Sequence, residues 1–95
     1  MERIGRWWER GEEIDVIGLN TQTKEIIFGE AKYSQKKAGG KVYNDLVDKA
    51  KYVDWNNEQR KEYFILFSKS GFEESLIRLA GKKQVFLVKE NCLIL

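Results

Sequence analysis

The spacing of apolar residues predicts strands in the first third of the chain. Apolar and β-prone residues fill residues 3–9, 13–20 and 25–33, and only a few polar residues separate these segments. Connections this short join antiparallel neighbours, because a parallel pair needs a long crossover. The three segments therefore predict an antiparallel meander.

The next part of the pattern predicts a helix followed by an interior strand. Gly39 and Gly40 let the chain leave the sheet, and apolar residues then recur at helical spacing over residues 41–55. Residues 62–69 form a continuous apolar run, which is typical of a central strand buried on both faces.

A second helix and a last strand complete the pattern. We expect this helix over residues 71–81, with Ser70 as its N-cap, Glu73 as the capping-box partner and Gly81 as the C-cap. A strand follows at residues 84–88, and a turn with a short apolar tail ends the sequence.

The predicted fold class is α/β, with a mixed sheet built in the order β-β-β-α-β-α-β. The strands joined through helices are expected to be parallel neighbours, by the right-handed crossover rule. The chain has 95 residues and is 42% hydrophobic, which indicates one globular domain over residues 1–95.

Composition narrows the possible chemistry. The sequence has no histidine, which excludes a histidine metal site and a Ser-His-Asp triad. Cys92 is its single cysteine, which excludes an internal disulfide and a cysteine zinc cluster. The sequence shows no signal peptide and no apolar run near the ~20 residues of a membrane helix, so we expect a cytoplasmic protein.

Three ionisable residues are expected to meet on the second and third strands. Asp15 shares a strand face with Glu13, and Glu30 shares a face with Lys32. For a turn centred near residues 22 and 23, Asp15 and Glu30 lie opposite one another, with Cβ atoms about 5 Å apart.

Two carboxylates this close repel each other unless a positive charge lies between them. Carboxylate oxygens completed by water are the ligands that Mg²⁺ accepts, and Lys32 on the same face could orient or deprotonate a water. This arrangement suggests hydrolysis of a phosphodiester. The alternative is a structural ion pair of Lys32 with Glu30 or Asp15.

A basic and aromatic segment follows these residues. The net charge of +2 is too small to indicate nucleic acid by itself, but residues 31–44 contain four lysines and no acid. Such a segment could contact a DNA backbone, or it could be a solvated loop with packed rings. The candidate DNA-binding residues are Tyr33, Lys36, Lys37, Lys41 and Tyr43.

The segments "EIDVIG" and "IIFGEAKYS" together resemble the PD-(D/E)XK nuclease superfamily. In that superfamily one strand carries Asp, the next carries (D/E)-x-K, and a helix and a further strand follow. The local sequence is nearest to the Holliday-junction-resolvase-like members. With "GRWWERGEEIDVIG" ahead, it looks especially like the nuclease-like domain at the C-terminus of archaeal ATPases. The resemblance covers about residues 4–90.

The resemblance implies a restriction-endonuclease-like fold and a metal-dependent deoxyribonuclease. Asp15 and Glu30 would be the metal ligands and Lys32 the catalytic lysine. The implied cofactor is Mg²⁺ or Mn²⁺, the implied substrate is DNA in branched or structured form, and an ATPase domain or partner is also implied.

One family feature has no counterpart in the sequence. Many members have a helix before the first strand that supplies another Glu near the metal. Glu2 and Glu13 are the nearby acids here, and neither matches that motif position, although Glu13 could add a carboxylate. We therefore expect a bare sheet face, a homodimer, and a chain that is part of a longer protein. The alternative function is a catalytically silent nucleic-acid-binding or dimerisation module.

Overall fold

The computed structural model describes residues 3–9, 12–56, 58–83, 85–89 and 92–93. These residues form six strands and two helices in the order β-β-β-α-β-α-β-β. The elements are β1 (Arg3–Glu9), β2 (Glu12–Asn20), β3 (Glu25–Lys32), α1 (Gly40–Ala50), β4 (Lys61–Ser68), α2 (Glu74–Ala80), β5 (Val85–Lys89) and β6 (Cys92–Leu93). The predicted order is confirmed, and β6 extends it by one short strand.

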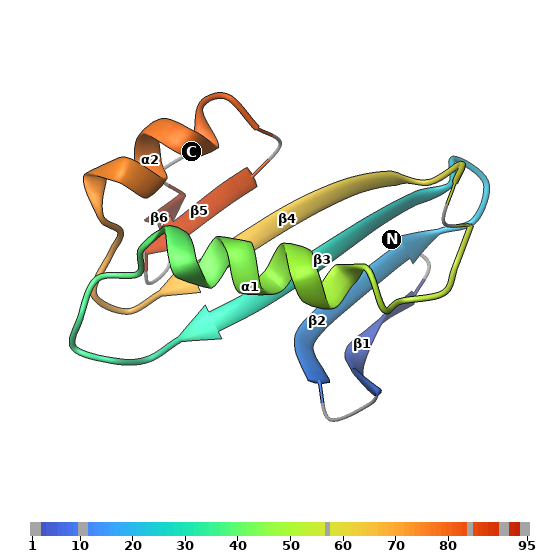
Figure 1. Cartoon of the computed structure of the whole chain (residues 1–95), viewed down its shortest axis with the longest axis horizontal. Coiled ribbons are helices and arrows are strands. Elements are labelled where there is room, and N and C mark those ends of the chain that lie inside the picture. Colours follow the sequence, from blue (N-terminus) through green and yellow to red (C-terminus); the bar gives the residue numbers. More distant parts are fainter. Residues whose placement is uncertain (1–2, 10–11, 57, 84, 90–91, 94–95) are drawn as a thin grey trace.

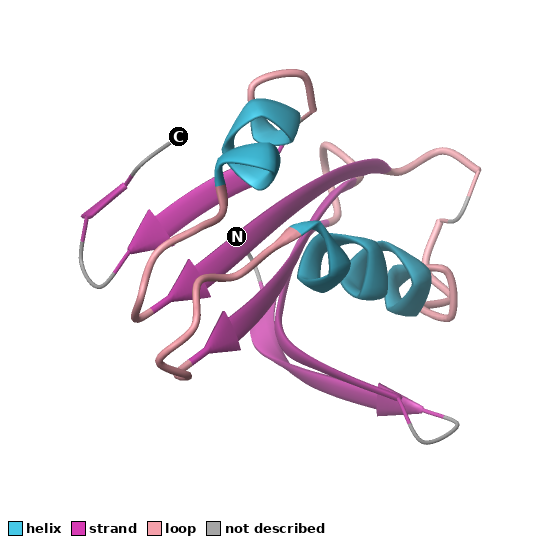
Figure 2. Ribbon diagram, turned by 60° about the vertical axis from the view of Figure 1, so that its left-hand side comes forward, coloured by secondary structure: helices cyan, strands magenta, loops and turns pink. Residues whose placement is uncertain are grey.

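The strands form one mixed sheet whose spatial order follows the sequence, from β1 to β6 (Figure 1). β1, β2 and β3 are antiparallel neighbours, which confirms the meander. β3, β4 and β5 are parallel neighbours, which confirms the crossover prediction, and β6 returns antiparallel to β5. The carboxyl ends of β3, β4 and β5 therefore lie at one edge of the sheet (Figure 2).

Both helices cover the same sheet face, and the core lies between them and the strands. Successive right-handed crossovers in one direction along a sheet place their helices on one side. The core joins strand residues with alternating spacing to residues of both helices. Its central members are Ile26, Phe28, Leu46, Ala50, Phe64, Leu66, Leu76, Ala80, Val85 and Leu87.

The opposite face of the sheet is open, which corrects the expectation that β4 is buried on both faces. On β4, Phe64, Leu66 and Ser68 are buried, whereas Ile65 and Phe67 on the other face are only partly buried. The expected bare face is thus present. Among the described residues, α1 connects β3 to β4 and α2 connects β4 to β5. Both connections step in the same direction along the sheet, so both helices lie on the other face.

The turn between β2 and β3 sets their register. The Asn20 side chain accepts hydrogen bonds from the backbone N–H groups of Gln22 and Thr23, at 3.1 and 3.3 Å, as in an Asx turn. Asn20 pairs with Glu25, and the pairing continues to Val16 opposite Gly29. This is the register that the sequence predicts.

The first helix ends at Ala50, five residues before its expected end at residue 55. Its C-terminus is capped from outside by Arg60, whose side chain is 4% exposed. The guanidinium donates to the carbonyls of Ala50, Val53 and Trp55, at 2.9, 2.7 and 3.2 Å, and lies over the Phe28 ring. These contacts give a charged donor to carbonyls at and beyond the end of the helix, where no intrahelical N–H is available to all of them.

The second helix begins later than expected. It starts at Glu74 with Glu73 as N-cap, and no side chain caps it, so the predicted capping box is wrong. The Ser70 hydroxyl instead donates to the backbone carbonyl of Ser34 at 2.7 Å. Gly81 is the C-cap, as expected.

Arg60→Met is expected to lower the free energy of unfolding by about 2–4 kcal/mol, because it leaves part-buried carbonyls without their charged donor. Urea denaturation measures this value. The control is Arg78→Met, which removes an exposed ion pair with Glu74 and should change stability by less than about 0.5 kcal/mol. Equal losses in the two variants would contradict the capping role.

Candidate active site

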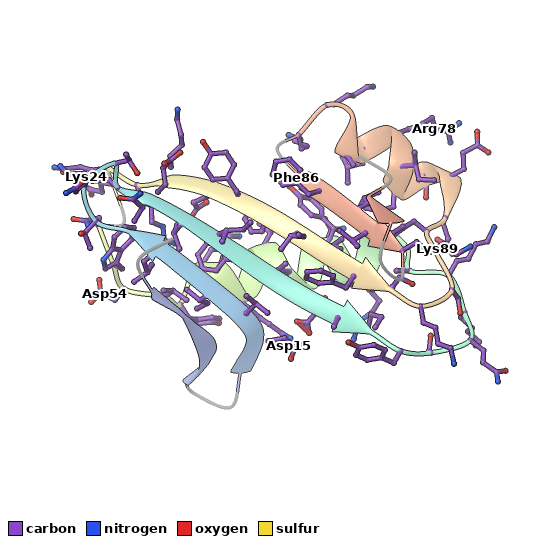
Figure 3. The ribbon with its side chains drawn as sticks, turned by 180° about the vertical axis from the view of Figure 1, so that it is seen from behind. Asp15, Lys24, Asp54, Arg78, Phe86 and Lys89 are labelled. Atoms are coloured by element: carbon purple, nitrogen blue, oxygen red, sulfur yellow. The ribbon has the colours of Figure 1, made fainter. Side chains whose placement is uncertain are left out.

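Asp15 is held against β3 by a backbone hydrogen bond. The pairing described for β2 and β3 reaches Val16 opposite Gly29. One step further, Asp15 Oδ2 accepts a hydrogen bond from the backbone N–H of Ala31 at 3.0 Å. The Asp15 carboxylate is therefore fixed at the residue that separates Glu30 from Lys32 (Figure 3 shows its place on β2).

Glu30 is buried at the centre of this group, with 9% of its surface exposed. Its Oε1 atom accepts a hydrogen bond from Lys49 Nζ at 3.4 Å, and the two charged groups form an ion pair. Its Oε2 atom is buried and has no hydrogen-bond partner among the described residues. A buried carboxylate oxygen in this state is costly, so it calls for a partner such as water or a cation.

The charges of the neighbouring side chains converge on Glu30. Burial raises the pKa of the Glu30 carboxyl above its ordinary value, and the Asp15 charge raises it further. The ammonium groups of Lys49 and Lys32 act in the opposite direction on that pKa. Asp15 and Lys32, as predicted from the sequence, thus lie within electrostatic reach of Glu30. Their catalytic role stays a prediction.

Lys49 is the residue of this group that sequence reasoning missed. A charged residue in a helix is ordinarily assigned to the solvated face. Lys49 follows the buried Leu46 of the same helix by three residues, so the two side chains lie on one side of α1. A lysine at such a position reaches the sheet, and this spacing was the available signal.

Lys49 also lines an open cleft along α1 with a volume of about 580 Å³. The other described residues of its lining are polar or amphipathic: Asp45, Asp48, Lys51 and Tyr52. The Lys49 ammonium therefore lies between this cleft and the buried Glu30 carboxylate.

Ser68 is the second buried polar residue that the sequence did not single out. It lies directly opposite Lys32 in the β3–β4 register and is 3% exposed. Its hydroxyl has no hydrogen-bond partner among the described residues. Glu30 and Ser68 thus supply two unsatisfied oxygens on adjacent strands of the same face.

The candidate DNA-binding residues are divided between solvent and core. Tyr33, Lys36 and Lys37 are exposed on the segment that leaves β3. Lys41 is also exposed and pairs with Asp45 at 3.1 Å within α1. Tyr43 is half-buried, and its ring packs edge-on against Phe64, so packing accounts for one side of this ring.

The candidate metal ligands fit a hard divalent cation as far as they are described. Glu30 supplies a buried oxygen without a partner, and Asp15 supplies a second carboxylate beside it. Mg²⁺ is commonly bound by one or two carboxylates and keeps several waters. Within the described residues, no group of three or more acids and cysteines could hold a metal. Glu13 pairs with Trp8 in the β1–β2 ladder, and its side chain lies outside the described residues.

Comparison with known proteins identifies relatives whose function is not established. Residues 1–61 match the family DUF234, described as archaea bacterial proteins of unknown function. An uncharacterised protein of Methanocaldococcus jannaschii is 41% identical over 69 residues, which cover 70% of this chain. The match spans only 15% of that longer protein. No solved structure matches the chain significantly.

Across the described residues, no helix is long and apolar enough to cross a membrane.

The Glu30 carboxyl is expected to titrate above the ordinary glutamate pKa of about 4.3, because burial disfavours its charged form. Side-chain carbon NMR measures this pKa. Lys49→Met should raise the pKa further, since the ammonium now opposes the effect of burial, whereas the control Lys51→Met should leave it unchanged. Because the folded-state pKa is the higher one, this group's contribution to stability falls as pH rises from the unfolded pKa through the folded one. An unchanged Glu30 pKa in Lys49→Met would contradict the ion pair.

Proposed function

The chain belongs to the DUF234 family, and from the geometry of its site we propose that it is a metal-dependent nuclease domain that hydrolyses DNA phosphodiester bonds. One observation carries this proposal: a buried, unpartnered Glu30 oxygen beside the fixed Asp15 carboxylate, with Lys32 within electrostatic reach. The proposed arrangement is restriction-endonuclease-like. The β-β-β-α-β order and the mixed sheet support it.

In this proposal the two carboxylates hold Mg²⁺ or Mn²⁺. The bound ion supplies positive charge that stabilises the phosphate as an in-line attack proceeds. Asp15 is oriented for this task because Ala31 N–H fixes one of its oxygens. Glu30 is oriented by Lys49, whose ammonium also favours the charged carboxylate that a metal requires.

Lys32 is the proposed catalytic lysine. It is the last residue of β3, and its side chain is exposed, unlike the buried Glu30 two residues earlier on the same face. An exposed lysine there can orient the attacking water or balance charge on the phosphate as the ammonium, or take a proton from the water as the neutral amine. Lys36 and Lys37 on the following segment are exposed and are the proposed contacts to the DNA backbone, with Lys41 as a further candidate.

Two partners belong to the same proposal. The open sheet face around the partly buried Ile65 would be covered in a homodimer. An ATPase domain or partner is compatible with a relative that extends far beyond the matched residues. The activity of such a longer protein is itself part of the proposal.

A second candidate is a catalytically silent DNA-binding or dimerisation module. The Lys49–Glu30 ion pair favours it, because a lysine already neutralises the buried acid without a metal. The open sheet face favours it as well. The two candidates differ in whether a divalent cation binds and whether cleavage follows.

The wild-type protein is expected to cleave branched, single-stranded or double-stranded DNA with Mg²⁺ or Mn²⁺, and chelation should abolish cleavage. Lys32→Ala should slow cleavage by about 10²–10⁴-fold, as loss of a group that assists proton transfer does. Gel assays of labelled DNA measure the rate. The control Lys61→Ala removes an exposed lysine at the other end of the β3–β4 ladder and should leave the rate unchanged. Absence of cleavage on all three substrates would favour the silent module.

Asp15→Asn is expected to weaken Mn²⁺ binding by about tenfold or more, because it removes one of two charged ligands while keeping an acceptor for Ala31 N–H. Electron paramagnetic resonance of free Mn²⁺ measures the affinity. The control Glu58→Gln removes an exposed acid outside the site and should bind like wild type. Equal affinity in wild type and Asp15→Asn would rule out this metal site, and a thermal melt checks that the variant folds.

A further inference from the structure

A pocket of about 300 Å³ lies at the carboxyl ends of β3 and β4. Its described lining is Tyr33, Phe67, Ser68 and Lys69. Phe67 lies opposite Ala31, on the open face of the sheet and away from the helices. The described lining of this pocket shares no residue with that of the α1 cleft.

Two aromatic rings give this pocket its character. Tyr33 directly follows β3 and is 81% exposed, which is the largest exposure among the large hydrophobic side chains described. Phe67 is partly buried beside it in the pocket lining. An aromatic ring that is largely uncovered by protein is a surface on which a nucleic-acid base can stack.

Exposed lysines gather at the same edge of the sheet. They come from the carboxyl ends of the three parallel strands and from the segment after β3 (Figure 3 shows Lys89 at this edge). Among the described residues, no ion pair joins them to an acid. The five lysines are Lys32, Lys36, Lys37, Lys69 and Lys89. Unpaired positive charge beside an aromatic pocket complements a phosphate backbone attached to bases.

The loops that border the pocket are tied together. Ser70 Oγ donates to the Ser34 carbonyl at 2.7 Å, and the Ala38 N–H donates to the Gly71 carbonyl at 2.9 Å. The backbone N–H of Lys69 also donates to the Lys32 carbonyl at 3.0 Å. The pocket is thus formed by backbone-bonded segments, and a ligand need not order them first.

We propose that this pocket binds an unpaired base of single-stranded DNA. The proposal rests on the proposed function and narrows its substrate to DNA with an unpaired segment. Lys32 and Tyr33 are consecutive residues whose Cα atoms are about 3.8 Å apart. A strand that crosses the carboxyl end of β3 at the Tyr33 pocket therefore also passes Lys32, the proposed catalytic lysine. A paired base cannot enter, because its two faces are covered within the duplex stack.

The test measures binding of fluorescent oligo-dT by anisotropy in EDTA, so that cleavage plays no part. Tyr33→Ala is expected to weaken binding about tenfold, and Tyr33→Trp should retain or increase affinity, because stacking depends on the ring and not on the hydroxyl. The control Tyr52→Ala removes another exposed tyrosine, on the turn after α1, and should bind like wild type. A dT·dA duplex of equal length should bind more weakly than oligo-dT and respond little to Tyr33→Ala.

Several results would overturn the proposal. The first is an oligo-dT affinity that Tyr33→Ala leaves unchanged. The second is a loss of affinity for duplex DNA in Tyr33→Ala equal to its loss for oligo-dT. The third is that Tyr33→Ala changes the oligomeric state of the protein and not its affinity for oligo-dT. A Tyr33-dependent affinity that is higher for oligo-uridine, or equal for the free nucleotide dTMP, would overturn the assignment to a DNA strand. Tyr33-dependent binding without any metal-dependent cleavage would leave this pocket in place and remove the proposed function. If Tyr33→Ala cleaves single-stranded DNA at the wild-type rate and affinity, the proposed function stands and the base-binding pocket is ruled out.

Discussion

The register between β2 and β3 is the constraint on which the candidate site depends. Side chains alternate between the faces of a strand, so a slip of one residue would turn Asp15 to the open face and leave Glu30 beside a different neighbour. The Asn20 turn fixes this register at one end, and the bond from Ala31 N–H to Asp15 fixes it at the other. In the second bond, the acceptor for the Ala31 N–H is the Asp15 carboxylate and not a backbone carbonyl. The Asp15 side chain therefore both bonds the β3 backbone and brings a negative charge beside Glu30.

The Lys49–Glu30 pair connects this charge balance to the packing of α1 on the sheet. A buried carboxylate next to a second acid is unfavourable, and the ammonium from α1 offsets part of that cost. The pair satisfies only one Glu30 oxygen, and the other remains buried without a partner among the described residues. A water or a cation can satisfy this second oxygen, and the proposed metal site uses it in the second way.

The local pattern determined much of the fold, but contacts between distant residues determined the rest. The order of elements and the register of the β2–β3 hairpin follow from apolar spacing and from one Asx turn. The end of α1 could not be predicted, because Arg60 caps Ala50 from ten residues further along the chain. The open far face of β4 depends on which side both crossovers take, and a continuous apolar run does not carry that information. Asp15 and Glu30 were recognisable by their types and spacing. Lys49 and Ser68 matter only because the fold brings them to Glu30 and Lys32.

The mixed sheet explains why the chemistry gathers at one edge. Because β3, β4 and β5 are parallel, their carboxyl ends share an edge, and the segments leaving them carry lysines to the same place. β2 runs in the opposite direction, so the first half of β2, not its end, lies beside the carboxyl end of β3. Because β2 and β3 are antiparallel, Asp15 near the start of β2 lies beside the residues at the end of β3. The sheet then separates two environments at the end of β3: a buried, acidic one beneath the helices around Glu30, and an open, aromatic and basic one around Tyr33. The acids of the proposed cation site and the ring of the proposed base pocket thus lie on opposite faces of the sheet at the end of β3. The proposed DNA strand would meet both where it crosses this edge.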